Sequence, residues 1–184
     1  MARENKTKYI ILGLLSHEPL TGYDIRQIAE RAISNFWTEI SYGQIYPTLK
    51  KLEKEGLVSK SIEVKENSPL RKVYSITSEG HKELRTWLET PADREVFKLD
   101  ILLKLYFGAQ TSIENSMKNI EMFRERNEKQ LEEYKGFENN LRETLDESED
   151  HFYILMTVLL GQHITKAQLQ WVEEVLPMLQ ERAK

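Results

Sequence analysis

The sequence predicts a mainly α-helical protein that carries one small β-hairpin and falls into two parts. Residues 57–64 and 71–77 alternate apolar and polar side chains, as half-buried strands do. Apolar residues elsewhere recur at helical spacing, and no strand pattern follows the Thr90-Pro91-Ala92-Asp93 segment. We therefore expect a mixed domain over residues 1–90 and an all-α domain with long antiparallel helices over residues 91–184.

The composition narrows the class of protein before any motif is considered. Of 184 residues, 30% are charged and 40% hydrophobic, as in a soluble globular protein. Cysteine is absent, which excludes disulfides and thiolate metal sites and suits the reducing cytoplasm. No apolar run approaches the roughly 18 residues that a membrane span needs, and no signal peptide is recognised. We expect a cytoplasmic protein that does not associate with membranes.

The first helices are short. Residues 9–15 form an amphipathic helix that ends near His17-Glu18-Pro19, and Thr21 is a candidate N-cap with Asp24 three residues later. Tyr23 in the following helix is interpreted as a core aromatic. Two roles stay open for Thr21, that of helix cap and that of phosphate contact.

The helix with the clearest sequence signals for its start, its buried face and its end is predicted to begin at Ser41. Ser41 and Gln44 have capping-box spacing, and Gly56 with Leu57 predicts a Schellman end. Ile45, Leu49 and Leu52 form the buried stripe, which leaves an aromatic and basic outer face: Tyr42, Gly43, Tyr46, Pro47, Lys50 and Lys51. Pro47 should bend the helix, with Gly43 relieving its clash one turn earlier.

The hairpin adds positive charge next to this helix. Its turn-rich tip is Glu66-Asn67-Ser68-Pro69, and its basic residues are Lys60, Lys65, Arg71 and Lys72. Another helix begins at about Ser78. The order of these elements, three helices, a two-stranded wing and a final helix, is that of a winged helix-turn-helix domain. The basic face suits phosphate contact, although a merely solvated amphipathic helix would show a similar pattern.

The second half is acidic and helical. A helix is expected from about residue 93 to Phe107, followed by Gly108 and a cap at Thr111 or Ser112. An imperfect heptad then begins at Ile113, interrupted by polar residues such as Asn127. With the last helix (150–180) it shows more apolar surface than one small domain can hide, which indicates dimerisation through Ile113, Met117, Ile120, Leu131, Phe152, Leu155, Leu159, Val172 and Leu176. Pairing within one chain alone is the alternative.

The first half also resembles a known family. The motifs Thr21-Gly22-Tyr23-Asp24-Ile25, Ser41 to Leu49 (SYGQIYPTL) and Arg71 to Gly80 (RKVYSITSEG) are similar to those of PadR transcriptional regulators. The acidic remainder resembles the longer branch of that family, which carries a C-terminal dimerisation region. The resemblance implies a homodimeric repressor on a palindromic operator in double-stranded DNA. It implies contacts from Tyr42, Gln44, Tyr46, Pro47, Lys50, Lys65, Arg71 and Lys72, to which we add Thr21 and Gly43. At Gln44 a DNA contact is in competition with another role, because the same side chain is predicted to cap the helix.

Some members of the family respond to small aromatic compounds, so the resemblance also allows for an effector of that kind. Five aromatic residues could line its pocket, although side chains of this kind are more often plain core: Trp87, Phe97, Tyr106, Phe107 and Trp171. Motifs for nucleotide binding, serine hydrolysis or zinc are absent and the four histidines are scattered, so neither an enzyme nor a cofactor or metal is expected. The alternative function is a winged-helix adaptor that binds proteins instead of DNA.

Overall fold

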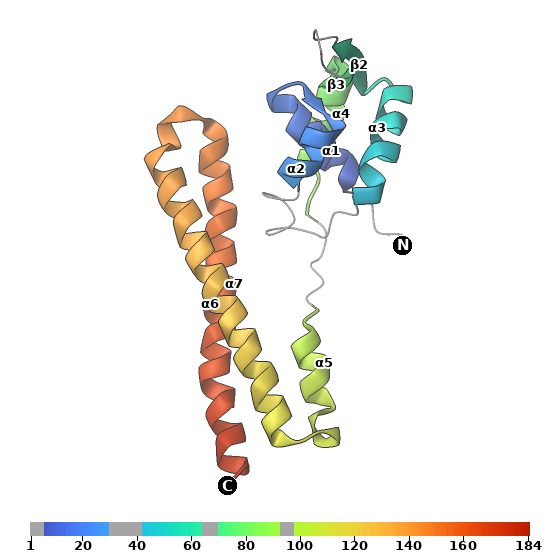
Figure 1. Ribbon diagram of the computed structural model, residues 1–184. Helices are drawn as coiled ribbons and strands as arrows, with labels where there is room; N and C mark the ends of the chain where they lie inside the picture. Colours follow the sequence, from blue (N-terminus) through green and yellow to red (C-terminus); the bar gives the residue numbers. More distant parts are fainter. Residues whose placement is uncertain (1–5, 30–41, 64–69, 93–97) are drawn as a thin grey trace. The chain divides into compact units, whose positions relative to one another are not determined.

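The chain forms two compact units, Met1–Arg94 and Glu95–Lys184, in a computed structural model (Figure 1). The structure describes residues 6–29, 42–63, 70–92 and 98–184. None of the described helices combines the length and the apolar character that a membrane span requires.

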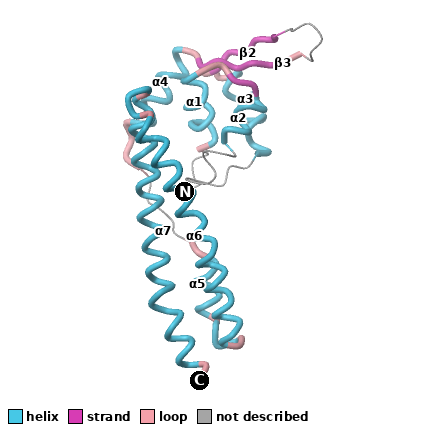
Figure 2. The backbone as a smooth tube through the Cα atoms, turned by 60° about the vertical axis from the view of Figure 1, so that its left-hand side comes forward, coloured by secondary structure: helices cyan, strands magenta, loops and turns pink. Residues whose placement is uncertain are grey.

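The first unit is a winged helix, as predicted. Its elements are α1 (Thr7–His17), β1 (Leu20–Thr21), α2 (Gly22–Ile28), α3 (Ile45–Lys54), β2 (Val58–Glu63), β3 (Arg71–Ile76) and α4 (Ser78–Leu88). The antiparallel sheet has the order β1-β3-β2, and the β2–β3 hairpin extends away from the helices in Figure 2. Sequence patterning missed β1, because two residues are too few to show alternation.

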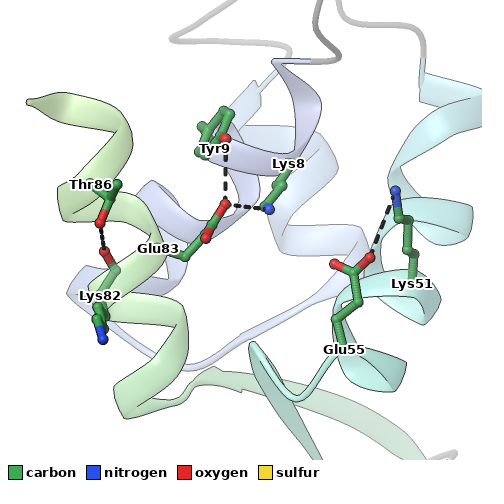
Figure 3. A network of polar contacts seen from close by, with 7 residues as sticks. All are labelled: Lys8, Tyr9, Lys51, Glu55, Lys82, Glu83 and Thr86. Carbon is green, nitrogen blue, oxygen red and sulfur yellow. Dashed lines mark hydrogen bonds and ion pairs between the residues drawn. The ribbon is translucent and has the colours of Figure 1, made fainter. Parts of the chain in front are cut away.

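The core of this unit lies between its helices. Buried side chains from α1, α2 and α3 meet there: Ile11, Leu12, Ile25, Ile45, Leu49 and Leu52. Figure 3 shows α1 between α4 and α3. This packing fixes α3 against the rest of the unit through its buried side alone, and so leaves its other side to solvent.

A polar network joins α1 to α4 at the edge of the core (Figure 3). The Glu83 carboxylate accepts hydrogen bonds from the Lys8 ammonium at 2.5 Å and the Tyr9 hydroxyl at 3.5 Å. The Lys8 hydrogen bond holds the pKa of Glu83 below its ordinary value. The Tyr9 ring stacks on Trp87 with centroids 4.3 Å apart, so Trp87 packs in this core.

The second unit is a helical hairpin preceded by a short helix. It contains α5 (Asp100–Tyr106), α6 (Ile113–Glu143) and α7 (Glu149–Arg182), with 3₁₀ turns η3 (Gly108–Gln110) and η4 (Leu145–Glu147) between them. Figure 1 shows α6 and α7 side by side along their length. Ser112 caps α6 by accepting a hydrogen bond from the Asn115 amide, as expected. The expected start of the preceding helix near residue 93 is wrong for Lys98 and Leu99, since Leu99 is extended.

Polar residues that interrupt the heptad have partners within the hairpin. Asn127 is buried and donates to the Phe123 carbonyl at 2.7 Å, and Gln162 of α7 donates to the Glu138 carboxylate at 2.5 Å. The apolar core next to them contains Ile101, Ile120, Phe123, Val172 and Leu176. The two long helices therefore do pair within one chain.

Candidate nucleic-acid interface

The front of α3 differs from the prediction. A 3₁₀ turn, η2 (Tyr42–Gln44), comes first, and the α-helix begins at Ile45; Ser41 lies outside the described residues. Pro47 is thus the third helical residue, where its missing N–H would have had no intrahelical partner. The expected bend and its relief by Gly43 were wrong, because Pro47 stands in the first turn and not in the helix interior.

The end of α3 is the predicted Schellman motif. Gly56 has φ of 74°, the Leu57 amide donates to the Leu52 carbonyl at 2.9 Å, and the Gly56 amide donates to the Glu53 carbonyl at 3.1 Å. The chain leaves α3 directly into β2, so the recognition helix and the wing are joined by one defined turn.

The outer face of α3 is open to solvent. Tyr46 is 55% exposed, and Gly43, Gln44, Pro47 and Lys50 are also exposed. Lys51 forms an ion pair with Glu55 at 3.7 Å, whereas Lys50 has no ion pair among the described residues. The Tyr42 side chain lies outside the described structure. The face presents a free ammonium and a phenol, both suited to a phosphate.

The predicted capping box of Gln44 includes Ser41, which lies outside the described residues; within the structure Gln44 is itself the N-cap of α3 and contacts α1. Its side chain makes no capping hydrogen bond, and its Oε1 accepts from the Thr7 hydroxyl of α1 at 3.4 Å. A base edge that bound the Gln44 side-chain oxygen would therefore compete with the Thr7 hydroxyl of α1.

The start of α2 lies against α3. Thr21 and Asp24 form the predicted capping box, and the Thr21 hydroxyl donates to the Asp24 carboxylate at 2.6 Å. A Cβ added to Gly22 would lie 2.6 Å from Cε1 of Tyr46, so the Tyr46 ring rests directly on the backbone of α2. Thr21 therefore has a structural role, and its phosphate contact stays a prediction.

Tyr23 is a residue that sequence reasoning placed wrongly. It is 57% exposed and not a core aromatic, and its hydroxyl accepts from the Gln27 amide at 2.7 Å. The signal was available, because Tyr23 lies two positions from buried Ile25, a spacing that turns it toward the opposite side of the helix. Its exposed phenol adds to the aromatic character of the α2–α3 surface.

The wing divides its basic residues between two roles. Arg71 and Lys72 are exposed at the start of β3 and have no ion pair within the described part of the chain. Lys60 instead pairs with Glu53 of α3 at 2.6 Å, a hydrogen bond that raises the pKa of Lys60. Lys65 lies outside the described residues. Within the described part of the wing, Arg71 and Lys72 are therefore the cations available to a phosphate.

A cluster of metal ligands is absent from the part of the chain that the structure describes. No three His, Asp or Glu side chains among those residues come together as a metal site would require.

Two family models together cover most of the chain. Residues 11–86 match the transcriptional regulator PadR-like family, and residues 97–180 match the virulence activator alpha C-term family. The negative transcriptional regulator PadR of Bacillus subtilis is 30% identical over 179 residues, which cover 94% of this chain and 96% of that protein.

Solved structures agree with the sequence relatives. Bacillus subtilis PadR in complex with operator DNA has a TM-score of 0.82 at 28% identity, covering 95% of this chain and 99% of that one. The same protein in complex with p-coumaric acid has a TM-score of 0.76 at 28% identity, covering 96% and 99%. The Vibrio cholerae virulence activator AphA has a TM-score of 0.74 at 26% identity, with the same coverage. The chain belongs to the PadR-like family of transcriptional regulators.

Proposed function

We propose that this regulator is a homodimeric repressor that binds a palindromic operator in double-stranded DNA and acts in the cytoplasm, by binding and not by catalysis. The observation that carries the proposal is the solvent face of α3, where Tyr46 and Lys50 are exposed. On the neighbouring wing, Arg71 and Lys72 are exposed and form no ion pair with the residues that the structure describes. The operator complex of a relative that matches over nearly the whole chain supports it.

In this proposal α3 enters the major groove. Tyr42, Tyr46 and Lys50 contact phosphates, while Gly43 and Pro47 allow close approach of the backbone at the front of the helix. Gln44 reads a base edge, Thr21 at the start of α2 faces the DNA backbone, and Lys65, Arg71 and Lys72 extend the contact to the flanking groove. Phosphate contacts supply affinity, and Gln44 supplies part of the specificity.

The test is a salt titration of binding to the DNA upstream of the protein's own gene. Lys50→Ala should weaken binding to all sequences and reduce the slope of log K against log [salt] by about one phosphate contact. Lys82→Ala is the matched control, because Lys82 lies on α4, on the other side of α1 (Figure 3). Wild-type protein without salt-dependent affinity for any DNA, or unchanged function after charge reversal at Lys50 and Arg71, would favour an adaptor instead.

We propose dimerisation through a second apolar face of α7. Leu155, Val172 and Leu176, together with Ile120 of α6, are buried within the chain and hold the hairpin together, whereas Ile113, Met117, Leu131 and Leu159 are half-buried. A separate stripe of exposed side chains four residues apart remains on α7: Phe152, Met156, Leu160 and Ile164. A twofold partner would cover this stripe, of which Phe152 is the member predicted from sequence.

Light scattering at micromolar concentration tests the dimer. Leu160→Lys should raise the dimer dissociation constant at least tenfold, because an ammonium would be buried without a partner. Leu88→Lys is the control, since Leu88 of α4 is 66% exposed and Leu160 is 62% exposed. A monomeric mass for the wild type, or identical masses for both variants, contradicts the proposal.

We also propose that a small aromatic acid releases the protein from DNA. The support is the crystal structure of Bacillus subtilis PadR with p-coumaric acid, a relative similar over 96% of this chain. Adding p-coumaric acid to the protein–operator complex should lower the DNA affinity, and in cells derepress a reporter under the operator. A complex whose affinity is insensitive to the acid excludes this ligand as effector.

A further inference from the structure

The Lys50 ammonium stands on a helix that also carries acidic side chains. Side chains three or four residues apart are neighbours on the surface of an α-helix. Glu53 is the acidic residue at that spacing from Lys50, because the other positions three or four residues away hold uncharged or basic side chains. An ion pair of this local kind does form on α3, between Lys51 and Glu55 at 3.7 Å (Figure 3). Glu53 is therefore a potential competitor of DNA for Lys50.

In the structure Glu53 pairs with the wing and not with Lys50. Its Oε1 lies 2.6 Å from Nζ of Lys60 on β2, and this hydrogen bond raises the pKa of Lys60. The Glu53 and Lys60 side chains are 33% and 31% exposed, whereas Lys51 in the neighbouring pair is 72% exposed, so solvent screens the Glu53–Lys60 pair less. Lys50 is exposed and forms no ion pair with any residue that the structure describes. The carboxylate next to Lys50 on α3 is thus occupied by the wing.

The register of the wing places Lys60 beside α3. Gly56 ends the helix in a tight turn, and β2 begins two residues later at Val58. Val58 is buried in the core with the helices, and side chains two residues apart on a strand point to the same face. Tyr74, which lies directly opposite Lys60 on β3, belongs to the same core. Lys60 therefore stands on the helix-facing side of the sheet, next to the last turn of α3 that carries Glu53.

We propose that Lys60 is a positioning residue for DNA binding, which holds the Glu53 carboxylate on the wing and so leaves the Lys50 ammonium free for a phosphate. Lys60 acts in this way without touching the DNA. In its absence Glu53 pairs with Lys50, and a phosphate must displace that carboxylate before it can bind. The recognition face then has one net positive charge fewer, which lowers affinity and counterion release. This role rests on the repressor function proposed above, and specifically on the phosphate contact of Lys50.

A salt titration of full-length variants on the DNA upstream of the protein's own gene provides the test. Lys60→Gln should weaken binding about threefold, the scale of one surface ion pair, and reduce the salt slope by about one contact. Glu53→Gln added to Lys60→Gln should restore both values, because no carboxylate is then left to pair with Lys50. Glutamine at either position can still form a hydrogen bond between α3 and β2, so these variants change the charge and keep the contact. Lys82→Gln on α4 is the matched control for the loss of one positive charge (Figure 3).

The pattern across the variants separates this role from the alternatives. A double variant as weak as Lys60→Gln alone would mean that Lys60 itself contacts a phosphate, and it overturns the proposal. In a Lys50→Ala background the effect of Lys60→Gln should largely vanish, and an undiminished effect also overturns it. Should Lys60→Gln fail to fold by circular dichroism, Glu53→Gln decides: affinity at or above wild type supports the role, and a loss refutes it.

Failure of this role differs from failure of the proposed function. A wild type that binds DNA with the expected salt dependence, alongside a Lys60→Gln variant of equal affinity, refutes the role of Lys60 alone. A wild type without salt-dependent affinity for any DNA refutes the proposed repressor, and the role of Lys60 falls with it.

Discussion

Two glycines in the long helices should respond to alanine in opposite ways. A Cβ at Gly161 of α7 would lie 2.6 Å from Cζ of Tyr134 and 2.9 Å from both its Cε1 and its hydroxyl oxygen. Tyr134 of α6 is 6% exposed, so its ring has little room to move aside. A Cβ at Gly136, in contrast, meets no described atom within 4 Å.

The magnitudes follow from two terms. Alanine is favoured over glycine in a helix interior by about 1 kcal/mol, which applies to both sites. Overpacking a filled core costs about 1–3 kcal/mol, which applies to Gly161 alone. We expect Gly136→Ala to stabilise the protein by ~1 kcal/mol and Gly161→Ala to change its stability by about 0 to −2 kcal/mol. For a chain of this size each kcal/mol shifts the Tm by roughly 2–4 °C.

Guanidinium unfolding at one fixed protein concentration measures both variants, because the proposed dimer would make stability depend on concentration. The double variant Gly161→Ala with Tyr134→Leu should recover part of the loss, since the smaller side chain vacates the contact. An equal gain for Gly161→Ala and Gly136→Ala would refute the reasoning, as it would mean that Tyr134 moves at no cost.

Three further predictions concern the winged helix. Gly56→Ala should destabilise by about 1–2 kcal/mol in urea unfolding, because a φ of 74° disfavours a Cβ, and Gly56→Asn should lose less; equal losses would contradict this. Thr21→Ala should cost ~1 kcal/mol in thermal unfolding and Thr21→Ser far less, because serine keeps the cap, and a silent Thr21→Ala would count against the capping role. The Lys8 hydrogen bond lowers the pKa of Glu83 from its ordinary value of 4.5, so its stabilisation is fully present above pH 4.5 and is lost as pH falls through the lowered pKa. Glu83→Gln should therefore reduce the loss of stability at acidic pH. If the loss is the same in the variant, protonation of Glu83 does not cause it.

Local signals along α3 were sufficient for most of the first unit. Ile45, Leu49 and Leu52 are buried, Gly56 has positive φ, and Thr21 caps α2, all as their spacing predicted. The error at Pro47 arises from a helix boundary: whether Pro47 stands in the first turn or the interior depends on where the helix begins, and helix ends are the least certain part of a prediction.

Other features depend on contacts between distant residues. Gln44 meets Thr7 of α1, Lys60 meets Glu53 of α3, and β1 exists through its pairing with β3. None of these partners is encoded in the periodicity of its own segment. In the second unit, the apolar content of the last helix could not separate residues that pair within the chain, such as Val172, from those left exposed, such as Phe152.

The ion pair between Glu53 and Lys60 has a consequence for changing which DNA sequence this regulator reads. It clamps the last turn of α3 to β2, while Gly22 lets the Tyr46 ring seat on α2 at the other end. A recognition helix transplanted from a relative would arrive at the right angle only if residues 22, 53 and 60 were exchanged with it. Transferring DNA specificity between members of this fold therefore requires the residues that orient α3 as well as those on its exposed face.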